Sequence, residues 1–349
     1  TGHWQIALDD STEFQARVLI PAVGQLSVPA RPRIPGLDDF TGALFHSAKW
    51  NGDFDLTDKR VGVIGTGASA IQFVPEVARR AALVSVFQRH APYVFPKYDR
   101  PFPAWERKLF RKLPWLPRAH RAIQWFSHEA RGFVLLRARW LVKSYEWRYR
   151  FILWRRIRDR ALREQLWPDH PLGCKRILFS NNYLQSISRD NVSIVTAPIE
   201  RVTPTGIRTG DGVEHAFDAI ILGTGFRATE FLAGIDVRGR KGVHLADRWR
   251  DGAHAYLGVA VPDFPNLFLL YGPNTNLGHN SIIFMIERQI DYVMGAIRRL
   301  VEHPRELIEI DPDVERRYNE AIQASLTDSI WVSGCDNWYK DDKGRIVNN

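Results

Sequence analysis

The sequence predicts an α/β fold built around a parallel sheet, and three observations lead to this prediction. An apolar strand, Arg60 to Ile64, runs into a turn of small residues and then into a helix-compatible stretch, Ala70 to Arg80. A second apolar strand follows at Leu83 to Phe87, so that strand, helix and strand succeed one another as in a parallel crossover unit. Later in the chain, residues 217–226 form another apolar strand that ends in a glycine-rich turn, as is common in doubly wound sheets.

The turn after the first strand has the spacing of a dinucleotide-binding loop, with Gly65, Gly67 and Ala70 at its three small positions. The two glycines allow a tight turn and let the backbone approach a pyrophosphate, and the third small residue lets helix and strand pack closely. The helix N-terminus supplies free N–H groups and a partial positive charge for the anion. The candidate residues of this loop are Gly65, Thr66, Gly67, Ala68, Ser69, Ala70 and Gln72.

Arg89 indicates which dinucleotide the loop would take. A NAD-specific fold needs an acidic residue at the end of the second strand, to bind the ribose 2′-hydroxyl. The sequence has none there, and Arg89 stands instead, 24 positions after Gly65. Because a guanidinium suits a 2′-phosphate, NADP is favoured over NAD; a solvated strand end is the less favoured explanation of Arg89.

The composition bounds the remaining possibilities. With 349 residues, 45% hydrophobic and 25% charged, the chain has the make-up of a soluble globular protein with two domains, or one with an insertion. The longest charge-free run, Phe264 to Ile286, is broken by prolines and polar residues and does not read as a membrane span. Cys174 and Cys335 form no disulfide framework, which predicts a reducing, cytoplasmic location. No metal-ligand spacing occurs among the His and Cys residues.

A strongly basic region, residues 100–163, interrupts this pattern. It holds eighteen Lys or Arg against four Asp or Glu, and six of the twelve Trp. Helical spacing joins an apolar stripe: Phe133, Leu136, Trp140, Trp147, Phe151 and Trp154. We interpret the region as a helical insertion packed over the active-site side of the NADP domain. Peripheral contact with an anionic membrane is the alternative; nucleic acid is disfavoured, because no recognised binding fold accompanies the charge.

A second signal precedes the loop. The pattern Phe40-x-Gly42-x-x-x-His46-x-x-x-Trp50 resembles the fingerprint of Baeyer–Villiger monooxygenases within the class B flavoprotein monooxygenases. Flavin-containing and N-hydroxylating monooxygenases carry a related version that usually ends in another aromatic residue, so Trp50 favours the Baeyer–Villiger branch. Asn51 departs from the Pro or Asp that usually follows.

The resemblance implies two Rossmann-like dinucleotide-binding domains, one for FAD and one for NADPH. Residues 1–45 would be a remnant of the FAD domain and a connector. Residues 46–215 would be the NADP domain with a helical insertion at about 100–165, and residues 216–349 the C-terminal part of the FAD domain. The earlier G-x-G-x-x-G that this family uses for FAD is missing, so we expect a chain truncated at its N-terminus. Whether this chain alone binds FAD stays open.

The resemblance also supplies a catalytic candidate. The block from Pro171 to Tyr183 resembles the one that carries the active-site arginine in this family, which implies Arg176 as catalytic residue and Lys175 as its neighbour near the nicotinamide cofactor. In this family an anionic peroxyflavin attacks the ketone, and a guanidinium stays charged while donating two parallel hydrogen bonds to the developing oxyanion. Without the family, a Lys-Arg pair before an apolar strand is usually solvated.

Five further cofactor-binding candidates follow from the resemblance: His46, Trp50, Asn274, Gly278 and Trp331. Trp331 resembles the tryptophan of a loop that covers the NADP ribose, and a buried structural tryptophan is the alternative. Around Gly278, ordinary helix capping by Asn280 or Ser281 is an equally simple explanation.

The predicted function is that of an FAD- and NADPH-dependent monooxygenase that inserts one oxygen atom of O2 into a ketone or oxidises a sulfide. A flavin-containing monooxygenase acting on amines is the alternative enzyme. A catalytically inactive NADP-binding or membrane-surface fragment is the alternative from another class. The predicted partners are small molecules and O2, with no nucleic acid and no metal.

Overall fold

The computed structural model describes residues 2–97, 99–136, 139–327, 329–332, 337–341 and 343–348. The chain divides into two compact units. The first, called here the sheet unit, comprises residues 29–112 and 138–226. The second, the C-terminal unit, comprises residues 1–28, 113–137 and 227–349. Each unit is described by itself.

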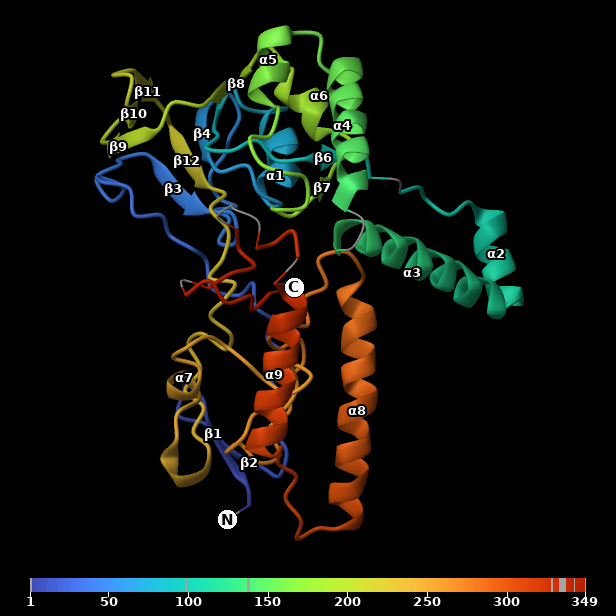
Figure 1. Ribbon diagram of the computed structural model, residues 1–349. Coiled ribbons are helices and arrows are strands. Elements are labelled where there is room, and N and C mark those ends of the chain that lie inside the picture. Colours follow the sequence, from blue (N-terminus) through green and yellow to red (C-terminus); the bar gives the residue numbers. More distant parts are fainter. Residues whose placement is uncertain are drawn as a thin grey trace. The chain divides into compact units, whose positions relative to one another are not determined.

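A five-stranded parallel sheet forms the centre of the sheet unit (Figure 1). Its strands lie in the order β3-β12-β4-β5-β8. Their bounds are β3 Ala43–His46, β4 Arg60–Ile64, β5 Leu83–Phe87, β8 Val192–Val195 and β12 Ala219–Leu222. This confirms the predicted α/β class with a parallel sheet.

Strands β12 and β4 are apolar on both faces, as parallel strands covered on both sides must be. All four residues of β12 are buried, and so are Val61, Val63 and Ile64 of β4. Helix α1 (Ala70–Val77) buries five of its eight residues. A core around Ile64, Phe87 and Ile220 extends to Leu37 and Phe40 of the connector, so the connector is fixed to the sheet.

Short helices and strands complete the sheet unit. Its helices are α2 Ala104–Lys112, the 3₁₀ helix η1 Arg139–Leu141, α4 Val142–Arg156, α5 Arg160–Gln165 and α6 Tyr183–Ile187. Strands β6 (Val94–Phe95) and β7 (Leu178–Phe179) pair in parallel. Tyr149 of α4 is fully buried, and its ring contacts those of Tyr93 and Phe95. The inner face of α4 is thereby fixed.

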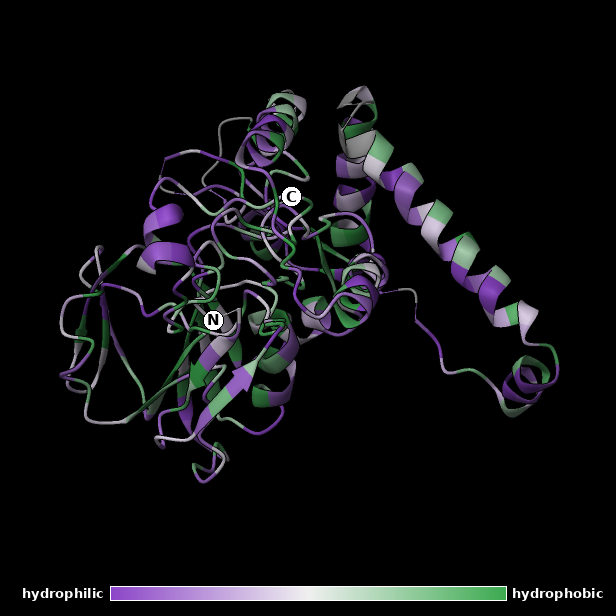
Figure 2. Ribbon diagram, turned by 90° about the horizontal axis from the view of Figure 1, so that it is seen from below, coloured by the Kyte–Doolittle hydropathy of each residue, from purple (hydrophilic) through white to green (hydrophobic). Residues whose placement is uncertain are grey.

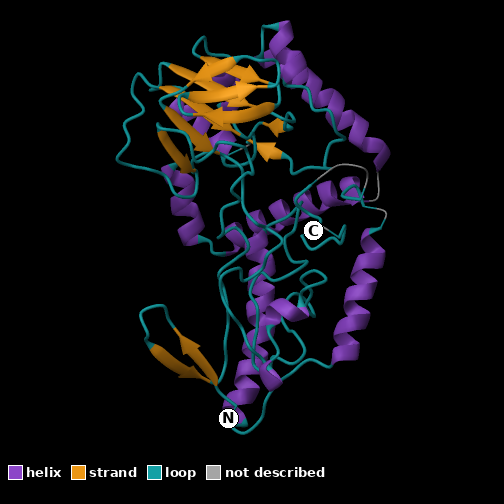
Figure 3. Cartoon of the chain, turned by 90° about the vertical axis from the view of Figure 1, so that its left-hand side faces the viewer, coloured by secondary structure: helices purple, strands orange, loops and turns teal. Residues whose placement is uncertain are grey.

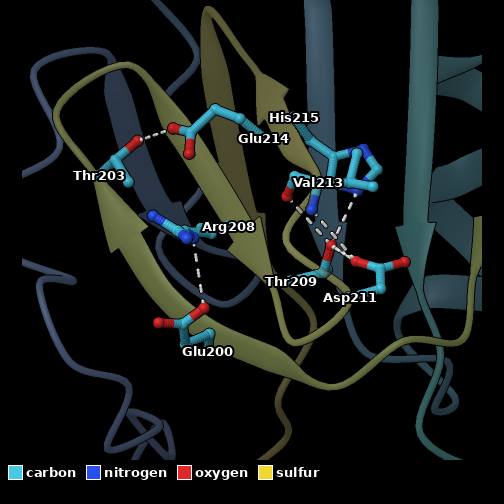
Figure 4. A network of polar contacts seen from close by, with 8 residues as sticks. All are labelled: Glu200, Thr203, Arg208, Thr209, Asp211, Val213, Glu214 and His215. Carbon is cyan, nitrogen blue, oxygen red and sulfur yellow. Dashed lines mark hydrogen bonds and ion pairs between the residues drawn. The ribbon is translucent and has the colours of Figure 1, made fainter.

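A small antiparallel sheet joins β8 to β12. It contains β9 Ile199–Thr203, β10 Gly206–Thr209 and β11 Glu214–Ala216. Figure 4 shows its polar contacts: the buried Thr209 hydroxyl lies 2.6 Å from the Asp211 carboxylate and 3.3 Å from Nε2 of His215. The Thr209 hydrogen bond lowers the pKa of Asp211 and closes the turn between β10 and β11.

The C-terminal unit consists mostly of helices and loops, with the hairpin β1–β2 as its only described sheet (Figure 3). Its elements are β1 Trp4–Ala7, β2 Glu13–Ala16, α3 Trp115–Leu136, η2 Arg240–Gly242, α7 Leu245–Arg248, α8 Ile282–Glu302 and α9 Pro312–Leu326. Backbone hydrogen bonds join Leu19 to Asn266 and to Phe268, so the segment after β2 runs beside residues 266–270. Apolar side chains around Phe264 and Leu267 form its core.

The basic insertion is helical, as predicted, but its helices belong to both units. Helix α3 packs within the C-terminal unit, where Arg121 pairs with Glu287 and the ring of Trp125 lies 5.9 Å from that of Phe284. Figure 2 shows hydrophobic and hydrophilic residues interleaved along α3. The described contacts of α3 are with its own unit, and packing of the insertion over the NADP domain stays a prediction.

The apolar stripe of the insertion is exposed where the structure describes its side chains. In α4 the buried residues are Val142, Tyr149 and Leu153, whereas the stripe residues are exposed. The exposed fractions are 72% for Trp147, 47% for Phe151 and 64% for Trp154; Phe133 and Trp140 are exposed as well, and the side chain of Leu136 lies outside the described part. Helix α4 carries two sets of apolar residues at helical spacing. The set that includes Tyr149 packs inward, and the set that includes Trp147 is exposed.

Two further expectations concern cysteines and membranes. Cys174 is buried, and the predicted reducing, cytoplasmic location stays a prediction. Cys335 lies outside the described residues. Within the described ranges, no helix has both the length and the apolar character needed to cross a membrane, and no three metal-ligating side chains gather.

Candidate functional site

The nucleotide-loop candidates lie where the strand order of the parallel sheet reverses. From β4 the chain proceeds to β5 on one side, and returns much later as β12 on the other side. In open α/β sheets, ligands bind at the carboxyl ends of the strands that flank such a switch point. Here those ends are the loops that start at Gly65 and Gly223.

Gly65 brings these two loops into contact. Its φ of +109° lies in the region that favours glycine, and an added Cβ would stand 2.5 Å from the carbonyl oxygen of Gly223. Gly67 differs, because an added Cβ there would meet no protein atom within 4 Å. Gly65 is therefore needed for the close approach of the two loops. The space beside Gly67 is open, and a ligand that contacts the loop backbone would require that space.

The rest of the loop leads into the helix as expected. Ala70 is fully buried at the start of α1. Ser69 occupies the N-cap position without a side-chain hydrogen bond, so its hydroxyl is not used for capping. Gln72 donates to the Ala68 carbonyl oxygen at 2.8 Å. Thr66 donates to the His90 carbonyl oxygen at 3.1 Å. The loop is therefore tied to the segment after β5.

Asp218 fixes β12 beside β4. Its carboxylate accepts hydrogen bonds from the backbone N–H of Arg60 at 2.7 Å and from the Arg60 guanidinium at 2.9 and 3.3 Å. These bonds lower the pKa of Asp218. The aspartate that opens the late strand motif thus aligns the starts of the two strands whose ends carry Gly65 and Gly223.

His46 ends β3 at the same edge of the sheet. Nδ1 of His46 accepts a hydrogen bond from the Ala48 N–H at 3.0 Å, which places the proton of the neutral ring on Nε2. Nε2 is buried and has no hydrogen-bond partner in the described part of the chain. Burial lowers the pKa of His46, and the nearby backbone of Gly225 offsets part of this effect. His46 therefore presents a buried neutral donor that a ligand could use.

Trp50 and Arg89 lie at the surface of the sheet unit. Trp50 is 42% exposed, and its ring meets the rings of Phe45 and Phe73 edge-on at 5.2 and 5.6 Å. Arg89 follows β5 and is exposed. The preceding Gln88 is buried and donates to the Gln165 carbonyl oxygen at 2.7 Å, so the backbone that carries Arg89 is fixed.

The segment that carries Lys175 and Arg176 is linked to the loop through two side-chain contacts. Thr66 holds the backbone of His90, and Nδ1 of His90 lies 2.7 Å from the Asp169 carboxylate. Asp169 precedes the segment 170–176, in which Lys175 is half-buried and Arg176 exposed. These contacts connect the catalytic candidate to the loop within one unit. The sequence offered no signal for His90 and Asp169, which are 79 positions apart.

The remaining three candidates lie in the C-terminal unit. A Cβ added to Gly278 would come within 3.2 Å of the Trp331 ring, so only a small residue fits there. Trp331 is buried and its ring centroid lies 5.2 Å from that of Tyr339, as the structural alternative expects. Asn274 donates to the Ile346 carbonyl oxygen at 2.9 Å. The structure brings Gly278 and Trp331 together.

Sequence reasoning missed a buried polar cluster in this unit. The Tyr271 hydroxyl donates to Oδ1 of Asn276 at 2.8 Å and accepts from Nε2 of Gln25 at 3.1 Å. Oε1 of Gln25 and Nδ2 of Asn276 are buried without a hydrogen-bond partner among the described residues. A polar ligand can supply the hydrogen-bond partners that such atoms lack. The sequence pattern did not indicate this cluster, because Gln25 and Asn276 are 251 positions apart.

Comparison with known proteins places this geometry in context. The family described as flavin-binding monooxygenase-like matches residues 1–113. A Baeyer–Villiger monooxygenase of Pseudomonas aeruginosa is 42% identical over 340 residues, covering 96% of this chain and 64% of that protein. An uncharacterized monooxygenase of Mycobacterium bovis is 36% identical over 343 residues, covering 98% and 69%. The crystal structure of OTEMO in complex with FAD and NADP matches with a TM-score of 0.86 and 29% identity, covering 99% of this chain and 73% of that one.

The relatives are longer than this chain. It spans 64% of the Pseudomonas aeruginosa protein, 56% of an FAD-binding monooxygenase of Aspergillus niger and 66% of a Baeyer–Villiger monooxygenase of Streptomyces coelicolor. The similarity nevertheless runs over nearly all of the residues present here.

Proposed function

We propose, from the premise that this chain belongs to the flavin-binding monooxygenase family that includes the Baeyer–Villiger monooxygenases, that it is an FAD- and NADPH-dependent oxygenase of ketones. The observation that carries the proposal is the pair of loops at the switch point. Gly65 and Gly223 are in contact there, and the Phe40–Trp50 fingerprint places His46 at the same sheet edge. Sulfides would be oxidised by the same site.

NADPH would be held by the sheet unit. The open space at Gly67 and the free helix N-terminus of α1 fit a pyrophosphate, and Arg89 fits a 2′-phosphate. The buried Nε2 of His46 would donate to a polar group of a cofactor. We assign the sheet unit to the NADP domain on these grounds.

FAD would be held in part by the C-terminal unit. The buried atoms of Gln25 and Asn276 that lack partners among the described residues fit the polar edge of a flavin ring. When bound, the flavin supplies the activation of O2 after reduction by NADPH. Arg176 would hold the negative charge that develops on the substrate oxygen, because a guanidinium stays protonated throughout.

A flavin absorbance experiment tests the proposed function. The purified protein is mixed with FAD, and its visible flavin band is recorded before and after addition of NADPH. A ketone or, in a parallel sample, an amine is then added in air. We expect the band to bleach with NADPH and an ester to form. Oxidation of an amine without ester formation would favour the flavin-containing monooxygenases instead. Binding of NADPH without FAD would contradict the proposed activity of this chain.

We propose a second, separate function for helix α4, which is contact with a membrane surface. The rings of Trp147 and Phe151 stack at 6.5 Å and those of Phe151 and Trp154 at 5.8 Å, all three exposed. Basic residues occupy the same helix: Lys143, Arg148, Arg150, Arg155 and Arg156. Exposed aromatic rings among Lys and Arg match the chemistry of an anionic lipid surface.

Vesicle pelleting tests this contact. We expect the protein to pellet with vesicles containing phosphatidylglycerol and not with pure phosphatidylcholine. Replacing Trp147, Phe151 and Trp154 together by Ser should weaken binding at least about tenfold, because three rings lose their apolar contact. Phe14→Ser serves as the control, since Phe14 is 52% exposed on β2, away from α4 in sequence. Equal binding of both variants, or no binding by the unmodified protein, would rule the contact out.

A further inference from the structure

A cavity of about 490 Å³ lies along one face of α9, in the C-terminal unit, and none of the residues considered above lines it. Helix α9 starts firmly, because Asp311 accepts hydrogen bonds from the N–H groups of Asp313 and Val314 and Pro312 follows it. We call this space the α9 cavity. The residues that matter in its wall are Arg248, His254, Glu315, Arg316, Asn319 and Arg345.

A buried network holds one wall of the α9 cavity. The Glu315 carboxylate is only 3% exposed and lies 2.6 Å from Nδ1 of His254 and 2.5 Å from Nδ2 of Asn319. Because the Glu315 carboxylate accepts from Nδ1–H, Nε2 of the neutral His254 ring is a hydrogen-bond acceptor and does not donate to an anion. The network therefore fixes both the orientation and the tautomer of an imidazole in the cavity wall.

Two guanidinium groups in the same wall each keep one donor without an acceptor among the described residues. Nε of Arg248 and Nε of Arg345 are buried and form no hydrogen bond with any described residue. Arg248 forms a long ion pair with Asp263, in which Nη1 lies 3.7 Å from the carboxylate, beyond hydrogen-bond distance. A buried donor without an acceptor is unfavourable, so each arginine gains if a ligand brings an acceptor oxygen.

The carboxylates of the wall do not fill this role, because each is already engaged. Asp313 and Glu320 pair with Arg316 at 3.0 and 3.3 Å. Glu315 is held by the His254 network. Arg248 and Arg345 keep their Nε donors unused. A wall whose acids are engaged and whose arginines keep unused donors is complementary to an anion.

We propose that the α9 cavity binds a small oxyanion, a phosphate or carboxylate group, through the guanidinium groups of Arg248 and Arg345. Guanidinium forks match both kinds of group, because each presents two oxygens at the right spacing. The proposal is independent of the oxygenase function, since it uses residues that carry neither the NADP nor the FAD assignment.

Ligand titration tests the proposal. The protein is titrated by calorimetry with inorganic phosphate and, separately, with acetate, at constant ionic strength made up with chloride. We expect saturable binding of at least one of them. Arg248→Gln and Arg345→Gln should each weaken that binding at least about tenfold, because each removes a charge-assisted hydrogen bond. Tighter binding of phosphate would identify a phosphate ligand, and tighter binding of acetate a carboxylate ligand; both support the site.

Arg250→Gln is the matched control. Arg250 lies two residues from Arg248, is 74% exposed, pairs with Asp247 and does not line the cavity. Its replacement should leave the affinity within about twofold. If Arg248→Gln unfolds the protein, Arg248→Lys keeps the charge and should still bind more weakly, because the fork is lost. Absence of saturation with both anions, or equal affinity in the Arg248, Arg345 and Arg250 variants, would overturn the proposal.

Discussion

Arg176→Ala is expected to leave NADPH oxidation by the FAD-loaded protein intact while lowering ester formation by about 10²- to 10³-fold. The reason is electrostatic. Hydride transfer from NADPH needs no charge on Arg176, whereas oxygen insertion places a negative charge on the substrate oxygen. Removing one fixed donor to such an oxyanion typically has an effect of this size.

The measurement is a comparison of two rates in the same sample, NADPH consumption and ester production. Arg208→Ala is the matched control, because Arg208 is an exposed arginine of the sheet unit that pairs with Glu200 in the small antiparallel sheet (Figure 4). It should leave both rates unchanged. Ester production near the unmodified level in Arg176→Ala would remove Arg176 from the mechanism. Equal loss of both rates would indicate a structural role instead.

The contacts around Arg176 illustrate what the sequence could and could not predict. Its position before a short strand followed from local sequence, and β7 begins two residues later, at Leu178. Its link to the nucleotide loop did not, because that link passes from Thr66 through His90 to Asp169. Such contacts depend on tertiary pairing between distant segments, which a single sequence does not encode in any local pattern.

The nucleotide loop between β4 and α1 was predictable because it depends on local sequence alone. Strand β4, the small-residue turn and α1 are consecutive, and each local preference agrees with the others. The pairing of β4 with β12 was not predictable in the same way. It joins Arg60 to Asp218, 158 positions apart, and depends on the crossover of the whole sheet.

Helix α4 shows a different limit. Its apolar residues fall into two sets with helical spacing, Tyr149 with Leu153 and Trp147 with Phe151 and Trp154. Periodicity finds both sets but does not rank them. The choice is made by the neighbours: Tyr149 packs against Tyr93 and Phe95, which come from a different part of the chain. The more aromatic set, which belongs to the stripe found in the sequence, is the exposed one.

Gly65→Ala and Gly67→Ala are expected to separate the structural from the ligand-binding role of the loop. In Gly65→Ala the new methyl group would stand 2.5 Å from the Gly223 carbonyl oxygen at a φ of +109°. Strain of this kind costs about 1–3 kcal/mol, so both the melting temperature and the affinity for NADPH should fall. In Gly67→Ala no protein atom lies within 4 Å of the new methyl group, so the free energy of unfolding should change by less than about 0.5 kcal/mol.

The affinity for NADPH decides what the space at Gly67 is for. If a pyrophosphate approaches the backbone there, the methyl group of Gly67→Ala contacts only the ligand and no protein atom. The affinity for NADPH should then fall at least about tenfold, while the free energy of unfolding stays unchanged. Gly52→Ala is the control, because it also has no protein atom within 4 Å and lies outside the loop. It should change neither quantity. An unchanged affinity in Gly67→Ala would mean that no dinucleotide contacts this part of the loop. The assignment of NADPH to the sheet unit would then rest on Arg89 and His46, whose substitution would have to weaken binding in its place.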